Sequence, residues 1–207
     1  MNKAYSKMIV FVLIMGTTAG AMLVGGDLLT RAQIQQNQIN LKQRTILQSH
    51  DYDLSSVTDL ANYYDDKIEV LTAPESYKDL PVNFYRDRES NDITIAFDKR
   101  FGSGVWGPIV GYLTLESDFV TIKSVAITSQ KETPGLGAKV TTAVFLDSLV
   151  GKVMEPRIVI DKIQLDTIDD LNFVTSIVGA TRTSVAFQNL LNTTYAYHKT
   201  IGGLFSL

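Results

Sequence analysis

Residues 105–150, VWGPIVGYLTLESDFVTIKSVAITSQKETPGLGAKVTTAVFLDSLV, hold the pattern that decides the fold. The first part, from Val105 to Ser129, is dense in Val, Ile, Tyr, Leu and Thr and is broken by Glu116-Ser117-Asp118. These residue types favour strands, and the polar break predicts a two-stranded hairpin. From Ala138 to Val150 the apolar residues recur at helical spacing, which predicts a helix after the hairpin.

The same mixture of elements continues on both sides of this stretch. Downstream, Arg157 to Leu165 alternates apolar and polar residues like a strand, and Thr183 to Tyr197 has the spacing of a closing helix. Upstream, Ile93 to Phe97 alternates and predicts another strand. Strands that are grouped together, with helices around them and no regular alternation, predict an α+β domain rather than a doubly wound sheet.

Two further segments precede or surround the strand predicted at Ile93 to Phe97. Ser56 and Asp59 resemble a capping pair, and apolar residues from Val57 to Leu71 then recur on one helical face, so we expect a second amphipathic helix there. Between Ala73 and Arg100 the sequence predicts loops, because the segment contains Pro74, Pro81 and the charged cluster Arg86 to Glu89.

An apolar stretch near the N-terminus predicts a membrane anchor. From Met8 to Gly26 there is no charged residue. As a helix this stretch is roughly 28 Å long, close to the thickness of a bilayer core. A secretory signal peptide is the alternative, since Lys3 and Lys7 precede the stretch and Ala19-Gly20-Ala21 has the small-x-small pattern of a cleavage site. We expect a retained single-span anchor.

The anchor sets the expected organisation of the chain. We predict a cytoplasmic tail (1–7), a transmembrane anchor in the lipid bilayer (8–29), a connecting helix (30–48) and one outer domain (49–207). The positive-inside rule discriminates little here, because basic residues stand on both sides of the span. A short tail followed by a folded domain favours a cytoplasmic N-terminus and a domain on the outer, periplasmic or extracellular side.

Composition excludes several classes of protein and of site. The 207 residues are 45% hydrophobic and 20% charged, which excludes collagen and disorder. The net charge of -3 argues against a nucleic-acid partner. With no cysteine and two histidines, His50 and His198, the chain cannot build an iron–sulfur or structural zinc site from its own ligands, so no metal is expected and a redox role needs an organic cofactor.

The most specific string is Glu132-Thr133-Pro134-Gly135-Leu136-Gly137, between a predicted strand and a predicted helix. Proline fixes one φ angle, the two glycines let the backbone approach a ligand, and Leu136 projects an apolar side chain between them. Glu132 and Thr133 offer a carboxylate and a hydroxyl at the same rim. An ordinary strand-to-helix connection is the alternative interpretation.

A second string, Gly179-Ala180-Thr181-Arg182-Thr183-Ser184, precedes the last predicted helix. Thr181 would expose a hydroxyl, while Thr183 or Ser184 could cap the helix. A phosphate attached there would face unpaired amides and the positive end of the helix dipole. A plain helix cap without a ligand is the alternative.

A third string, Gly102-Ser103-Gly104-Val105-Trp106-Gly107-Pro108, contains the one tryptophan of the chain. A planar ring beside flexible backbone could pack against a planar cofactor. The alternative is that Trp106 is a core residue at the start of a strand.

Together the three strings resemble a known family. They occur in this order and at this separation in the FMN-binding subunits that include the C subunit of sodium-pumping NADH:quinone oxidoreductase and the G subunit of the Rnf ferredoxin:NAD oxidoreductase. The resemblance covers the anchor and essentially the whole outer domain. It implies an electron-carrying subunit of a membrane redox-driven ion pump, with the other subunits of the Nqr or Rnf complex as partners.

The resemblance also implies roles for individual residues. FMN would be held covalently by a phosphoester to Thr181, attached by a separate flavin transferase, with Gly179 and Ala180 at the phosphate end. Trp106, Glu132, Thr133 and Leu136 would contact the isoalloxazine or its ribityl chain, and Thr183 belongs to the same cofactor-binding set. No independent catalytic residues are implied.

This chain departs from the family motif at two positions. The family usually has an acidic residue six positions before the modified threonine and Ser or Thr three positions before it, where this chain has Thr175 and Val178. Arg182 is also unusual, although a guanidinium beside a phosphodiester is electrostatically favourable. Gly111 to Asp118 and Gln43 to Leu47 resemble the sodium-pump protein more, so the G subunit of Rnf is the alternative. A tethered flavin-binding or assembly module without electron transfer is an alternative of another class.

Overall fold

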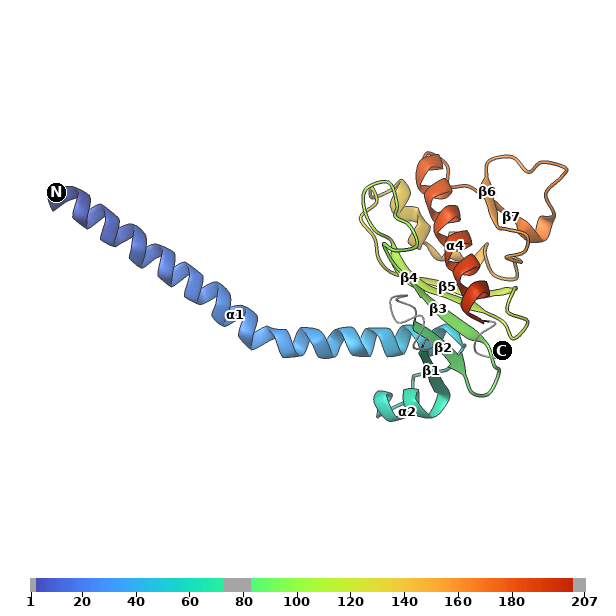
Figure 1. The fold of residues 1–207 in the computed structure, drawn as a ribbon, viewed down its shortest axis with the longest axis horizontal. Coiled ribbons are helices and arrows are strands. Elements are labelled where there is room, and N and C mark those ends of the chain that lie inside the picture. The colour runs from blue at the N-terminus through green and yellow to red at the C-terminus, as the bar shows by residue number, and fades with distance from the viewer. Residues whose placement is uncertain (1–2, 73–82, 203–207) are drawn as a thin grey trace. The chain divides into compact units, whose positions relative to one another are not determined.

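The computed structural model describes residues 3–72 and 83–202 (Figure 1). The chain forms two compact units, Met1–Lys42 and Gln43–Leu207. The loop prediction at Pro74 and Pro81 lies outside the described residues.

Helix α1 (Lys3–Ser49) is one continuous α-helix, which confirms the helix predicted over residues 30–48. By length and composition it is long and apolar enough to cross a membrane. Within the first unit, the hydroxyls of Thr17 and Thr18 donate to carbonyls one turn earlier, at 2.8 and 2.7 Å. These polar side chains are therefore satisfied within the helix itself.

The second unit is built on a five-stranded antiparallel sheet in sequence order (Figure 1). Its strands are β1 (Ile68–Thr72), β2 (Asn83–Asp87), β3 (Ile93–Phe97), β4 (Val110–Leu115) and β5 (Ile122–Ser129). The predicted strand at Ile93 to Phe97 and the hairpin broken at Glu116 to Asp118 are both confirmed. Helices and a grouped antiparallel sheet together confirm the α+β class.

Strand β2 was missed, and the loop prediction was wrong for this part of the chain. Phe84 and Tyr85 are fully buried, on opposite faces of the strand. Arg86 pairs with Glu69 on neighbouring β1 at 2.6 Å. The charges that favoured a loop are therefore neutralised across two strands, which a sequence pattern along one strand does not reveal.

Each face of the sheet has its own core because side chains alternate along the strands. One face, with Phe84, Ile95 and Leu113, packs against helix α4 (Thr181–Gly202), which lies across the sheet in Figure 1. Around Tyr85 the other face packs against the last turns of α1 and helix α2 (Leu60–Lys67), through Ile46, Leu47 and Tyr64.

Helix α2 is shorter than predicted. Asp59 is its N-cap, accepting a hydrogen bond from the Asn62 amide at 3.1 Å. The helix ends at Lys67, because Ile68 and Leu71, which fit its apolar face in sequence, belong to β1 and pair with β2. Strand pairing overrides the helical spacing at this point.

The helix predicted from Ala138 to Val150 is two short pieces. They are the 3-10 helix η2 (Gly137–Thr141) and α3 (Ala143–Asp147), separated by Thr142 with extended backbone. The break turns Val144 to solvent, where it is 85% exposed, and buries Phe145. A continuous helix would have placed Val144 on the same face as the buried Val140.

The strand predicted from Arg157 to Leu165 is also shorter. Only β6 (Val159–Asp161) is regular; it pairs in parallel with β7 (Phe173–Thr175), which follows the 3-10 helix η3 (Asp170–Asn172). Ile163 and Leu165 are 74% and 60% exposed. On its other edge, β6 meets side chains of α4, since the Ile160 amide donates to Gln188 Oε1 at 2.7 Å. The predicted closing helix is confirmed as α4.

Candidate functional site

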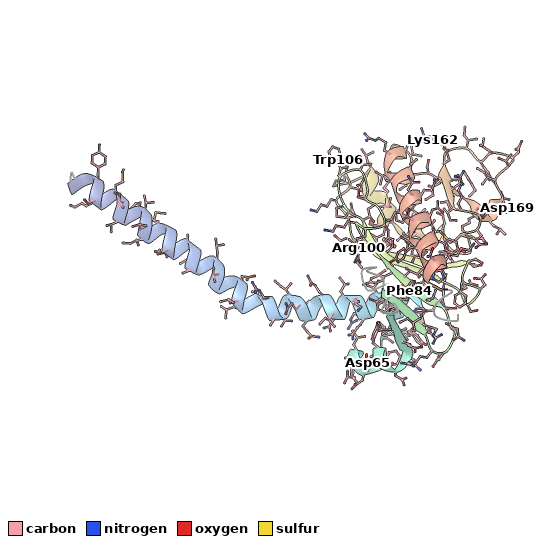
Figure 2. All side chains as sticks on the ribbon, viewed as in Figure 1. Asp65, Phe84, Arg100, Trp106, Lys162 and Asp169 are labelled. Carbon is pink, nitrogen blue, oxygen red and sulfur yellow. The ribbon has the colours of Figure 1, made fainter. Side chains whose placement is uncertain are left out.

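The three strings meet at the N-terminal end of α4. Residues 104–107 approach from the loop before β4, residues 132–137 from the loop after β5, and residues 179–184 form the first turn of the helix and its approach. Trp106 and Lys162 lie on either side of this helix end (Figure 2). The predicted site residues therefore converge on one region, although the first and last of them, Trp106 and Thr183, are 77 positions apart in the sequence.

The Glu-Thr-Pro-Gly string forms a tight turn. The Leu136 amide donates to the Thr133 carbonyl at 3.1 Å, and Gly135 has a φ of 76°. A type II turn requires a positive φ at its third residue, here Gly135, and often has proline at its second, here Pro134. The turn carries Thr133 and Leu136 to the surface, with Leu136 46% exposed.

Glu132 is buried beneath this turn and is only 4% exposed. Its Oε2 accepts a hydrogen bond from Thr183 Oγ1 at 2.6 Å, and its Oε1 accepts one from the Trp106 amide at 3.0 Å. One carboxylate thus connects all three strings. Each of its oxygens has a protein donor, and Glu132 is not among the residues that line the pocket above it.

Two glycines leave room for this carboxylate. A Cβ on Gly104 would lie 2.3 Å from Glu132 Oε1. A Cβ on Gly137 would lie 2.6 Å from Thr183 Oγ1 and 2.8 Å from Glu132 Oε2. These glycines allow close approach of backbone to a buried side chain, a use that the sequence did not indicate.

Trp106 is not a core residue. Its side chain is 69% exposed, although its backbone is fixed through the amide bond to Glu132. The adjacent Gly104 amide donates to the Gly107 carbonyl at 2.8 Å and closes the loop. A large aromatic ring is therefore presented to the surface by an anchored loop.

Neither hydroxyl that was predicted to cap α4 does so. Thr183 donates to Glu132, while Ser184 Oγ accepts from the Ile177 amide at 3.1 Å and donates to the Ala180 carbonyl. Among the described residues, no acceptor is found for the amides of Thr181 and Arg182. The first helical amides thus stay available at the surface, as at anion-binding helix ends.

A pocket of about 470 Å³ opens where the strings meet. Its lining combines an exposed aromatic ring, apolar side chains, hydroxyls and two cations, without a carboxylate. The lining residues are Val105, Trp106, Thr133, Leu136, Gly137, Lys162, Gly179, Ala180, Thr181, Arg182 and Thr183.

Thr181 and Thr183 differ sharply within this lining. Thr181 is exposed and is the first residue of α4, whereas Thr183 is 5% exposed and donates its hydroxyl hydrogen to Glu132. Gly179, just before α4, has a φ of 79°. Its backbone lies close to Leu136, because a Cβ added at Gly179 would be 3.2 Å from Leu136 Cδ2. Of the two threonines, Thr181 has the accessible hydroxyl.

Sequence reasoning missed Lys162, Val105 and Gly137 as pocket residues. Lys162 comes directly after β6, and the strand predicted to continue to Leu165 placed it inside a regular element. The two positions that depart from the family motif lie apart from the pocket: Val178 is 84% exposed and Thr175 ends β7. Neither lines the pocket around Thr181.

The second unit has other hollows. One of about 440 Å³ lies along α4 and shares Val105, Thr181 and Arg182 with it. A larger one, of about 550 Å³, lies beside α3 and β7 and includes none of the predicted cofactor-binding residues. The pocket of 470 Å³ is the one that combines Thr181 with the exposed Trp106.

Both histidines are buried, and neither lines the pocket. His50 Nε2 is 2.9 Å from Thr94 Oγ1, and its Nδ1 is 4.0 Å from Asp87 Oδ2. Burial lowers the pKa of His50, against the opposing effect of Asp87. Burial also lowers the pKa of His198 to about 4. They therefore act as structural groups of the core.

Comparison with known proteins shows which family the region of the site resembles. Residues 104–196 match the FMN-binding domain family. Every residue that lines the pocket falls inside the matched region. The chain also resembles, in sequence and in fold, proteins named as the C subunit of Na(+)-translocating NADH-quinone reductase.

Two curated relatives illustrate the sequence likeness. The C subunit of this reductase from Chlamydia pneumoniae is 45% identical over 51 residues, which are 25% of this chain and 16% of that protein. The C subunit from Yersinia pestis is 29% identical over 97 residues, 44% of this chain and 36% of that protein. The alignments thus cover well under half of each curated relative.

Solved structures share the fold of most of the chain. The C subunit from Parabacteroides distasonis aligns with a TM-score of 0.65 and 24% identity, covering 83% of this chain and 96% of that one. NqrC from Shewanella oneidensis aligns with a TM-score of 0.60 and 20% identity, covering 78% and 97%. At these identities the likeness establishes the fold.

Proposed function

We propose that this protein carries FMN on its outer domain, in phosphoester linkage to Thr181, and relays electrons within a membrane complex of the Na(+)-translocating NADH-quinone reductase type. The observation that carries the proposal is the exposed Thr181 hydroxyl at the first turn of α4, on a pocket inside the FMN-binding domain. The names of the relatives favour this complex over the Rnf alternative.

The residues present fit a phosphorylated flavin. Free amides, Arg182 and Lys162 surround Thr181 and would favour a phosphate there. Trp106 and Leu136, both exposed on the same pocket, would pack against an isoalloxazine ring. When bound, FMN would supply the reversible electron transfer, which is chemistry of the cofactor and not of the protein.

The protein's own part is to hold and orient the ring. Glu132 fixes the loop of Trp106 and the first turn of α4 relative to each other through hydrogen bonds of 3.0 and 2.6 Å. This buried connection would set the pocket's shape before a ligand enters, so that little has to be ordered on binding.

The deciding measurement is the intact mass of the denatured full chain, produced with and without a flavin transferase, followed by peptide mapping. We expect a gain of one FMN less one water, located on Thr181 and not on Thr183, whose hydroxyl is buried and hydrogen-bonded. Thr181→Ala should abolish the gain and keep the fold, because the side chain is exposed. Thr181→Ser, which keeps a hydroxyl, is the matched control.

An unmodified mass in both preparations would contradict the covalent linkage. Thr175 and Val178 would then have removed the attachment signal, and a tethered flavin-binding or assembly module would be the better account. Retention of flavin by denatured Thr181→Ala protein would assign the linkage to another residue.

The anchor is proposed to span the inner membrane once, with its N-terminus in the cytoplasm and the domain on the periplasmic or extracellular side. The apolar window of α1 supports membrane insertion. Because the chain has no cysteine, single cysteines at Ser117 and at Ser6 give clean reporters. In intact spheroplasts, an impermeant maleimide should label Ser117→Cys and spare Ser6→Cys; the reverse pattern would invert the topology.

A further inference from the structure

Two cations from different parts of the chain face the pocket around Thr181. Lys162 follows strand β6, and Arg182 stands beside Thr181 on α4. Figure 2 places Lys162 beside the N-terminal end of that helix. Both lie within the FMN-binding domain but outside the residues that the family resemblance implied as ligand contacts.

Neither cation has an ion-pair partner in the described part of the chain. Over residues 3–72 and 83–202, no carboxylate lies within ion-pair distance of Lys162 Nζ or the Arg182 guanidinium. Five lysine or arginine side chains of the described second unit do have an acidic partner within ion-pair distance: Lys67, Arg86, Arg100, Lys123 and Lys199.

The nearby acidic groups are already engaged elsewhere. Glu132 accepts from Thr183 and Trp106 below the pocket, at 2.6 and 3.0 Å. Asp161 precedes Lys162, and its Oδ1 accepts from the Lys162 backbone amide at 2.6 Å. The pocket lining itself holds two positive charges and no negative one, which is a complementary environment for a dianionic phosphomonoester.

We propose that Lys162 and Arg182 are specificity-determining residues that make this pocket select phosphorylated flavin over riboflavin. The inference rests on the proposed function and adds the residues that recognise the phosphate before or without a covalent bond. Lys162 holds the anion from the β6 side and Arg182 from the helix side. Riboflavin has the same ring and ribityl chain but lacks the phosphate with which these two cations would pair.

The test is direct titration of the full chain, in detergent and produced without a flavin transferase, with FMN and with riboflavin. Trp106 is the only tryptophan and lines the pocket, so quenching of its fluorescence reports occupancy. Lys162→Gln and Arg182→Gln should each weaken FMN binding about tenfold and leave riboflavin binding unchanged. Lys139→Gln, an exposed lysine outside this pocket, is the matched control and should change neither.

A second measurement needs no variant. Raising the NaCl concentration should weaken binding of FMN to the wild-type chain and spare riboflavin, since salt screens charge pairs at a surface. Equal loss of both flavins in Lys162→Gln, or unchanged FMN affinity in that variant, would overturn the inference and leave the proposed function standing. Failure of the wild-type chain to bind either flavin without a transferase would also overturn this inference, whereas the proposed function is overturned only by an unmodified mass after production with the transferase.

Discussion

Thr183 Oγ1 donates a hydrogen bond of 2.6 Å to Glu132 Oε2, and both residues are about 5% exposed or less. The bond joins the first turn of α4 to the loop after β5. Since the other Glu132 oxygen accepts from the Trp106 amide, one buried carboxylate fixes the loop of the exposed tryptophan as well. The shape of the pocket thus depends on a side chain that does not line it.

Replacing this carboxylate tests the dependence. Glu132→Ala leaves the Thr183 hydroxyl and the Trp106 amide without their acceptor, so we expect a loss of about 2 kcal/mol in the free energy of unfolding and weaker flavin binding. Glu132→Gln is the matched control, because its amide keeps one acceptor and the Thr183 hydroxyl can rotate to accept. Urea unfolding and Trp106 quenching measure the two effects. Equal behaviour of both variants would show that the hydrogen bonds are unimportant.

The two glycines of the turn should respond differently to alanine. A Cβ on Gly137 meets Thr183 Oγ1 at 2.6 Å, so Gly137→Ala should separate the Glu132–Thr183 pair and impair flavin binding. Gly135 has a φ of 76° and nothing within 4 Å of an added Cβ. Gly135→Ala should therefore cost only about 1 kcal/mol of backbone strain.

Gly135→Asn is the control for that strain, because asparagine tolerates the left-handed conformation better. Flavin titration and urea unfolding of the three variants give the comparison. The account of the turn would fail if Gly137→Ala bound flavin as well as Gly135→Ala does.

Much of the fold was predictable because the β4–β5 hairpin and helix α4 follow their local sequence patterns. Their apolar residues bury the faces that the spacing predicts, such as Leu113 and Leu115 on β4 and Phe187 and Leu191 on α4. Strand β2 was not predicted, because its charged residue Arg86 favoured a loop in sequence but pairs with Glu69 on the neighbouring strand in the structure. Such cross-strand partners exist only once the sheet has formed.

The site was predictable in part. Individual strings indicated Trp106 as a ring that could pack against a cofactor and Thr181 as an exposed hydroxyl, but nothing in the spacing places them on one pocket. Lys162 could not be found because it depends on where β6 ends, and the pairing of β6 with β7 ends at Asp161 and Thr175. Local pattern predicts elements better than it predicts where they stop.

A buried hydroxyl chain away from the site gives a stability prediction. Thr94 Oγ1 lies 2.9 Å from His50 Nε2 and 2.7 Å from Thr114 Oγ1, and both threonines are fully buried. Thr94→Val keeps the shape but leaves both His50 Nε2 and Thr114 Oγ1 without their partner, so it should lower the free energy of unfolding by about 1–3 kcal/mol. Thr114→Val is the control, expected to cost less because it leaves the His50–Thr94 contact in place. Urea denaturation measures the two losses of stability. A larger loss in Thr114→Val than in Thr94→Val would contradict the prediction.

His198 should make the stability depend on pH. It is packed among the rings of Phe84, Phe119 and Tyr195, and burial lowers its pKa to about 4. An unfolded histidine titrates near 6.5, so between about pH 6.5 and 4 the unfolded chain binds a proton that the folded chain does not. The free energy of unfolding therefore falls as the pH drops through this window, by up to about 3 kcal/mol from His198.

The variant His198→Phe isolates this contribution. Phenylalanine preserves the aromatic packing and cannot take up a proton, so its free energy of unfolding should fall less steeply between pH 6.5 and 4 than that of the wild type. His50, whose pKa burial also lowers, remains in both proteins and gives both the same residual slope. The comparison is between slopes from urea unfolding at several pH values, which removes any constant effect of the larger ring. Parallel curves for the two proteins would mean that His198 is protonated in the folded state as readily as in the unfolded chain.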